Sequence, residues 1–70
     1  MHLELISELL AFARRNALRF NYWFDNERKV YTFRFQDQER TWGYFREVAQ
    51  DRLDVSDIIN TLKIKVPGIC

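Results

Sequence analysis

Residues 19–35 read RFNYWFDNERKVYTFRF, and this stretch decides the fold of the 70-residue chain. Apolar and polar residues alternate on both sides of a charged segment, DNER at 25–28, which predicts a β-hairpin with that segment as its loop. If Phe24 pairs with Lys29, the facing pairs are Tyr22–Tyr31, Phe20–Phe33 and Leu18–Phe35. Six of the seven aromatic residues then share one face: Phe20, Tyr22, Phe24, Tyr31, Phe33 and Phe35. A register slip of one residue would turn this face outward, and the strong alternation argues against it.

The segments around the hairpin supply the elements that cover its apolar face. Residues 3–16, LELISELLAFARRN, carry apolar residues at three- and four-residue steps and predict an amphipathic helix that ends at a left-handed Asn16. A polar turn, DQER at 37–40, leads to residues 41–48, where Trp42 and Tyr44 could extend the apolar face as a third strand. Residues 46–53 could equally begin a helix.

The C-terminal third predicts a second helix. Asp54 is a suitable N-cap, with Asp57 three residues later in the manner of a capping box. The apolar stripe of this helix consists of Val55, Ile58, Ile59 and Leu62. The sequence therefore predicts one α+β domain over 1–70 with the order α-β-β-β-α, in which two helices pack on one face of a three-stranded antiparallel meander. Residues 65–70 form a C-terminal tail in this prediction.

The other face of the sheet carries the candidate binding residues. In the predicted register Arg19 lies opposite Arg34, Trp23 lies opposite Val30, and Phe45 lies beside Thr32. An exposed tryptophan among apolar and basic side chains is typical of a binding surface. The candidates are Arg19, Trp23, Val30, Arg34 and Phe45. Two alternatives stay open: Glu47 or Asp51 neutralises the arginines, or the tail with Ile64 and Val66 covers Trp23.

The composition argues against several kinds of chemistry. The chain holds 11 basic and 10 acidic residues, for a net charge of +1, with one histidine and one cysteine. His2 and Cys70 stand at the two ends, and Cys70 is interpreted as an incidental thiol or an intermolecular link. No activated nucleophile, zinc spacing or glycine-rich phosphate loop is evident, and Asp51, Asp54 and Asp57 fit helix capping better than a metal site. We therefore expect a non-enzymatic protein without cofactor or metal.

The longest apolar run, residues 9–13, is too short to span a membrane. A lone cysteine fits a reducing compartment, so the sequence predicts a cytoplasmic protein.

The chain resembles two groups of known proteins. The segments LELISELLAF, FNYWF, YTFRF, WGYFRE and DVSDIINTL resemble short reading frames of bacteriophages and prophages. That resemblance implies a small accessory or inhibitor protein that binds a host or phage macromolecule, and it assigns no functional residue. The order of elements is similar to that of double-stranded-RNA-binding domains, which carry lysines at the start of their second helix. This chain has Asp51, Arg52, Asp54 and Asp57 there, which disfavours phosphate binding.

Two functional hypotheses follow. In the first, the chain is a protein-interaction module that docks a protein, or a second copy of itself, through the open sheet face or an edge strand. In the second, it binds nucleic acid: Arg14, Arg15, Arg19 and Arg34 supply charge, and Trp23 or Phe45 stacks on a base. A continuous basic stripe on the sheet face would favour nucleic acid, and an apolar centre with a mixed rim would favour protein.

Overall fold

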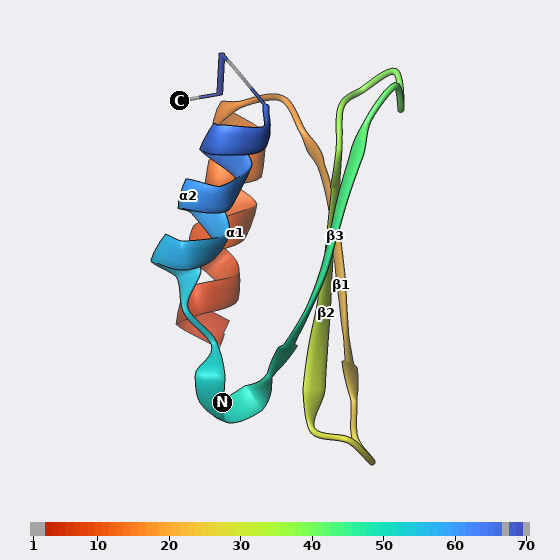
Figure 1. Ribbon diagram of the computed structural model, residues 1–70, viewed down its shortest axis with the longest axis vertical. Helices are drawn as coiled ribbons and strands as arrows, with labels where there is room; N and C mark the ends of the chain where they lie inside the picture. Colours follow the sequence, from red (N-terminus) through yellow and green to blue (C-terminus); the bar gives the residue numbers. More distant parts are fainter. Residues whose placement is uncertain (1–2, 67, 70) are drawn as a thin grey trace.

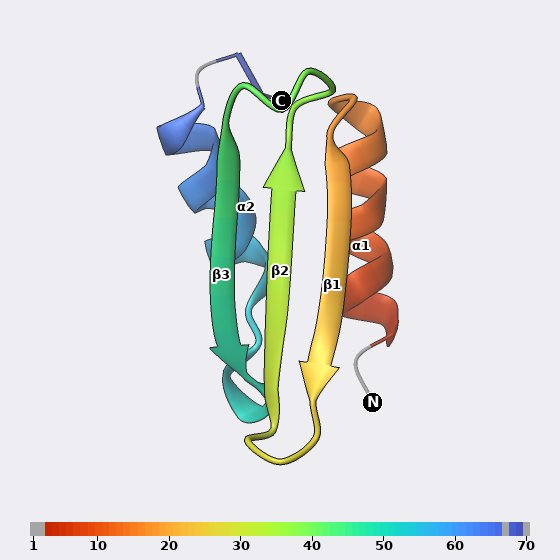
Figure 2. The ribbon, with the colours of Figure 1, turned by 90° about the vertical axis from the view of Figure 1, so that its right-hand side faces the viewer.

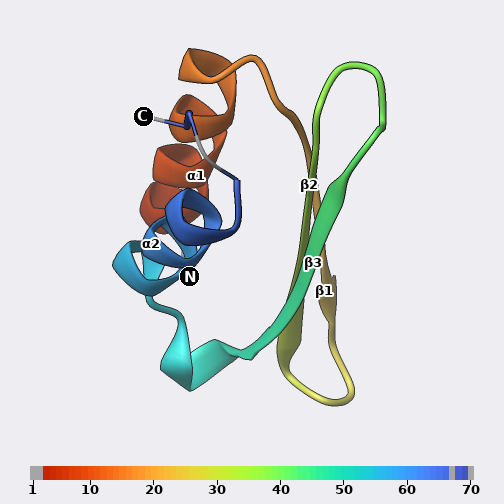
Figure 3. The ribbon, with the colours of Figure 1, turned by 45° about the horizontal axis from the view of Figure 1, so that its top comes forward.

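The computed structural model describes residues 3–66, 68 and 69, and it confirms the predicted α+β fold. The elements follow the order α1 (Leu3–Arg15), β1 (Arg19–Asp25), β2 (Val30–Gln36), β3 (Gly43–Ala49), a 3₁₀ turn (Gln50–Arg52) and α2 (Val55–Lys65). Both helices lie on one side of the sheet, and its other side is uncovered (Figures 1 and 3). His2, Pro67 and Cys70 lie outside the described residues, and so do the interpretations that concern them.

The sheet is an antiparallel meander in which β2 lies between β1 and β3. The predicted register was wrong: Phe24 pairs with Tyr31, Tyr22 with Phe33, and Phe20 with Phe35. Each pairing is displaced by two residues from the prediction, so every side chain keeps its predicted face.

The cause of the displaced register is the hairpin loop, which occupies residues 26–29 and not 25–28. The Asp25 carboxylate accepts the backbone N–H groups of Glu27 and Arg28, at 3.0 and 3.2 Å. Lys29 adopts a left-handed conformation, with φ 57°, and returns the chain into β2. Asp25 is therefore the last residue of the strand, and its carboxylate holds the loop backbone as aspartate does in an Asx turn.

The core lies between the inner face of the sheet and the two helices. Phe33 and Phe35 of the central strand are completely buried, together with Leu9 of α1 and Ile58 and Leu62 of α2. Tyr22 departs from the prediction, since 45% of it is exposed although it points toward the helix layer. The reason is topological, because β1 is an edge strand and nothing flanks Tyr22 on its outer side.

The end of α1 differs from the prediction by one residue. Ala17, and not Asn16, is left-handed, with φ 56°. The N–H of Leu18 donates to the Ala13 carbonyl at 2.8 Å, and the N–H of Ala17 donates to the Arg14 carbonyl at 3.2 Å. These two bonds define a Schellman motif, whose left-handed position is usually glycine. Asn16 instead donates its side-chain amide to the Phe12 carbonyl at 3.0 Å.

The predicted turn at 37–40 is present, because the Arg40 N–H donates to the Asp37 carbonyl at 3.1 Å. The Asp37 carboxylate accepts the Thr41 and Trp42 N–H groups, at 2.6 and 3.3 Å, and the Thr41 hydroxyl. The hydroxyl bond is the main reason that the pKa of Asp37 lies below its ordinary value. One carboxylate thus organises the connection between β2 and β3.

The segment between β3 and α2 resolves the ambiguity over residues 46–53. Residues 46–49 belong to β3, and residues 50–52 make a single 3₁₀ turn. Asp54 caps α2 as predicted, since its side chain accepts the Asp57 N–H at 3.2 Å. The Asp57 carboxylate pairs with Arg46 of β3 and thereby ties α2 to the sheet. Among the described residues, neither helix has the length and apolar character needed to cross a membrane.

Candidate interaction surface

The face of the sheet that points away from the helices is called the open face here. Its side chains form four rows across the three strands, as set by the strand register. From the Arg19 end of β1 to its Asp25 end, the rows are Arg19–Gln36–Gly43, Asn21–Arg34–Phe45, Trp23–Thr32–Glu47 and Asp25–Val30–Ala49. Figure 2 views this face directly and shows that neither helix of the described part of the chain crosses it.

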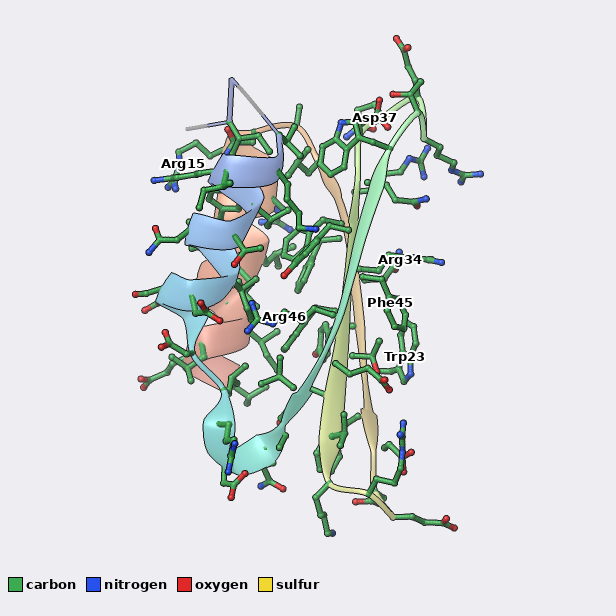
Figure 4. All side chains as sticks on the ribbon, in the orientation of Figure 1. Arg15, Trp23, Arg34, Asp37, Phe45 and Arg46 are labelled. Atoms are coloured by element: carbon green, nitrogen blue, oxygen red, sulfur yellow. The ribbon has the colours of Figure 1, made fainter. Side chains whose placement is uncertain are left out.

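The centre of the open face is an aromatic pair. Trp23 of β1 and Phe45 of β3 lie on a diagonal across β2, with ring centroids 6.2 Å apart and a tilted arrangement. Both side chains project away from the helices (Figure 4), and 48% of Trp23 and 58% of Phe45 are exposed. Thr32 lies between them on the central strand and is only 2% exposed. The two rings therefore cover the middle of the sheet and form a raised apolar patch.

An ion-pair network borders the patch on the side of the 26–29 loop. Arg28 donates from Nε to the Asp25 carboxylate at 2.8 Å and from an Nη atom to the Glu47 carboxylate at 2.9 Å. The Arg28 hydrogen bond lowers the pKa of Asp25, and the Asp25 hydrogen bond raises the pKa of Arg28. With two carboxylates and one guanidinium, this rim carries a formal charge of −1.

The opposite rim is basic. Arg34 lies between Asn21 and Phe45, and it has no ion pair within the described part of the chain. Arg19 makes one long hydrogen bond, from Nε to the Gln38 carbonyl at 3.5 Å. Both side chains are exposed. The open face therefore has an apolar centre and rims of opposite charge.

The structure brings together four of the five predicted site residues but corrects their neighbours. Arg19 and Arg34 are not directly opposite each other, because Arg34 faces Asn21 and Arg19 faces Gln36. Trp23 faces Thr32, and Phe45 faces Arg34. The corrections for Arg19, Arg34 and Trp23 follow from the displaced β1–β2 register, and the correction for Phe45 follows from the β2–β3 register.

Val30 is the fifth predicted residue, and it lies one row beyond Trp23, toward the 26–29 loop. It is partly buried in the last row of the open face, between Asp25 and Ala49.

The contacts of Glu47 and Ile64 argue against the two alternative explanations of the open face. Glu47 pairs with Arg28 and not with the arginines of the basic rim. Ile64 belongs to α2 and is 81% exposed, so it does not cover Trp23. The contribution of Asp25 and Arg28 was missed from the sequence, although an aspartate directly before a polar loop is a recognisable Asx-turn signal.

The described residues contain no group of three or more histidine, cysteine, aspartate or glutamate side chains that could hold a metal ion. Comparison with known proteins gives no family to which the chain can be assigned. No protein-family model matches it, and no curated protein or solved structure shows significant similarity to it.

Proposed function

We propose that this protein is a small non-enzymatic interaction module that docks a protein partner through its open face. The observation that carries the proposal is the exposed Trp23–Phe45 pair at the centre of a sheet face that no other element covers. Tryptophan and arginine are enriched among the residues that dominate protein–protein binding energies. An apolar centre surrounded by a polar rim is the usual composition of such interfaces.

The charge distribution favours a protein over a nucleic acid. A phosphate backbone requires a continuous basic surface. Here Asp25 and Glu47 lie on the same face as Arg19 and Arg34, in the two rows nearer the 26–29 loop. A protein partner can match both rims, with acidic groups near Arg34 and basic groups near Glu47. An accessory or inhibitor role, such as those of small phage proteins, is one setting in which a module of this kind would act.

A matched pair of variants tests the proposal. Phe45→Thr replaces one ring of the aromatic pair with a residue that is common in strands, and Ile64→Thr removes an even more exposed apolar side chain from α2. Each variant and the parent protein are immobilised, and the proteins retained from cell extract are compared. We expect Phe45→Thr to lose the retained protein and Ile64→Thr to keep it. Equal retention by all three would contradict the proposal.

Nucleic-acid binding is the second candidate, supported by Arg34, which lies beside Phe45 without a carboxylate partner among the described residues. It is tested by anisotropy titration of labelled single- and double-stranded DNA and RNA at about 50 and 200 mM salt. Binding that weakens steeply at the higher salt would indicate phosphate contacts and would replace the first proposal. No binding at the lower salt would eliminate this candidate.

A further inference from the structure

A second surface, separate from the open face, lies along the outer edge of β1. The carbonyl of Lys29, directly before β2, accepts the N–H of Gln50, directly after β3, at 2.9 Å. Because hydrogen-bonded pairs alternate along an antiparallel ladder, the odd-numbered residues of β2 make their backbone hydrogen bonds to β3. The even-numbered residues of β2 then bond toward β1, where their partners are Arg19, Asn21, Trp23 and Asp25. The backbone groups of Phe20, Tyr22 and Phe24 consequently point away from the sheet. Within the described residues, none of them has a backbone hydrogen-bond partner in another element.

An apolar groove runs beside this free edge. It has a volume of about 310 Å³ and lies between α1 and β1, lined mainly by Leu3, Ile6, Ser7, Leu10, Phe20 and Tyr22. This volume is at the lower end of the range for ligand pockets, about 300–1,000 Å³. Leu3, Leu10 and Tyr22 are among the exposed large apolar residues of the chain. An unpaired strand edge and an apolar groove therefore lie side by side.

The two edges of the sheet are protected differently. On β3, Arg46 points inward and bonds to the Tyr44 hydroxyl and the Asp57 carboxylate. An inward-pointing charge at an edge strand discourages pairing with another chain. On β1 the inward residues are Phe20, Tyr22 and Phe24, so this edge has no such charge. β1 is therefore the edge that is open to an added strand.

The position of α1 argues against a second copy of this chain as the added strand. Figure 2 shows α1 projecting beyond β1 at that edge. Joining two β1 strands about a twofold axis would place both α1 helices beneath the same pair of neighbouring strands, which are spaced by only about 4.8 Å. Packed helices need about 8–10 Å between their axes. A single extended segment has no helix beneath it and avoids this clash.

The charges along the groove define the orientation of that segment. Glu4 in the first turn of α1 and Asp25 at the end of β1, whose carboxylate also bonds to Arg28, mark one end, because α1 and β1 run in opposite directions. Arg14 and Arg19 mark the other end. A segment that runs antiparallel to β1 has its N-terminal side near the carboxylates and its C-terminal side near the arginines. It is favoured by charge and by the slightly more stable antiparallel ladder.

We propose that the edge of β1 and the α1–β1 groove bind an extended peptide segment of a partner protein. The segment adds antiparallel to β1 as a fourth strand, has an apolar side chain at every second position, and runs from a basic N-terminal to an acidic C-terminal end. Its backbone bonds to Phe20, Tyr22 and Phe24, and the apolar side chains opposite Phe20 and Tyr22 enter the groove. This is strand addition with side-chain specificity supplied by a neighbouring helix. It is independent of docking at the open face.

The probe for this proposal is a synthetic heptapeptide, Lys-Val-Thr-Val-Thr-Val-Glu, with free termini. When its ends align with Asp25 and Arg19, the three valines lie opposite Phe24, Tyr22 and Phe20. N-methylation of the valines blocks N–H groups that point at β1, whereas N-methylation of the threonines blocks N–H groups that point to solvent. We expect the valine-methylated peptide to bind about tenfold more weakly than the parent peptide, or worse, and the threonine-methylated peptide to bind within about twofold of it.

A matched pair of protein variants tests the groove. Ser7→Arg introduces a long side chain from the groove wall, and Ser56→Arg places the same change at an exposed position of α2. We expect Ser7→Arg to weaken peptide binding at least about tenfold, with Ser56→Arg and Phe45→Thr unchanged. In amide spectra, the signals of Phe20, Tyr22 and Phe24 should shift on binding, and those of Phe45 and Glu47 at the β3 edge should not.

Several outcomes would overturn the proposal. They are absence of saturable binding up to about 1 mM peptide, equal effects of the two methylation patterns, and shifts at β3 in place of β1. Self-association that Ser7→Arg abolishes would identify a second copy as the occupant and would also overturn it. Since Phe45→Thr is included, failure of this proposal is distinguishable from failure of docking at the open face.

Discussion

The backbone conformation at the end of α1 predicts whether a glycine there raises or lowers the free energy of unfolding. Ala17 occupies the left-handed position of the Schellman motif, with φ 56°. A left-handed conformation costs a residue with a Cβ about 1–2 kcal/mol, and glycine does not incur that cost. Glycine also gains freedom in the unfolded chain, which offsets about 0.5–1 kcal/mol of the benefit. Ala17→Gly should therefore raise the free energy of unfolding by about 0.5–1 kcal/mol.

The control is the same substitution at Ala11, an exposed position within α1. There the conformation is helical, and Ala→Gly should lower the free energy of unfolding by about 1 kcal/mol. Urea denaturation followed by tryptophan fluorescence measures both changes. For a domain of this size, 1 kcal/mol corresponds to about 4–8 °C in the melting temperature. If Ala17→Gly destabilised the protein as much as Ala11→Gly, the reasoning from the left-handed cap would be refuted.

Three further predictions concern the sheet and its loops. Phe33→Ala should lower the free energy of unfolding by about 3–5 kcal/mol, because Phe33 is fully buried. Trp23→Ala should leave a folded domain whose free energy of unfolding, measured by urea denaturation, falls much less. Unfolding of the Trp23 variant would identify Trp23 as a core residue. The folded-state pKa of Asp37 is lowered from 3.8, so its carboxylate stabilises the fold above that pH and this contribution is lost as the pH falls below it. Asp37→Asn should then reduce the difference in unfolding free energy between pH 7 and pH 3, and an unchanged difference would argue against the role of Asp37. Arg46→Val should remove the inward charge of β3 and raise self-association in sedimentation velocity, whereas sedimentation identical to that of the parent protein would contradict edge protection by Arg46.

The fold could be predicted because its signals are periodic and agree with one another. The two-residue alternation around Phe20 and Phe33 decides which face is buried, and the helical stripe ending in Leu62 supplies its cover. The faces survived a wrong register because the displacement was an even number of residues. The open face with Trp23 and Phe45 could be predicted for the same reason.

The neighbours within that face could not be predicted, because they depend on where a loop begins. The choice between Asp25 as the first loop residue and as the last strand residue rests on its bonds to the N–H groups of Glu27 and Arg28. That choice also determines that Arg28 reaches Glu47. The helix end shows the same limitation, because Asn16 has the higher left-handed preference but Ala17 takes the position. Leu18 follows it and packs against the core, which places the bend one residue later.

The groove beside β1 has no counterpart in the sequence pattern. Its existence depends on which strand lies at the edge and on how far α1 extends past it. Neither property has a local signal. Tyr22 illustrates the point, since its position in the alternation is typical of a core residue, whereas its exposure follows from the strand order.

The central claim is that the open face docks a protein, and site-specific photocrosslinking tests it most directly. A benzophenone amino acid replaces Phe45 at the centre of the face and, in a control protein, Ile64 on α2. After irradiation in cell extract, we predict a discrete protein adduct from position 45 that is absent from position 64 and is lost when Trp23→Ala is added. Adducts only with nucleic acid, or equal adducts from both positions, would contradict the claim.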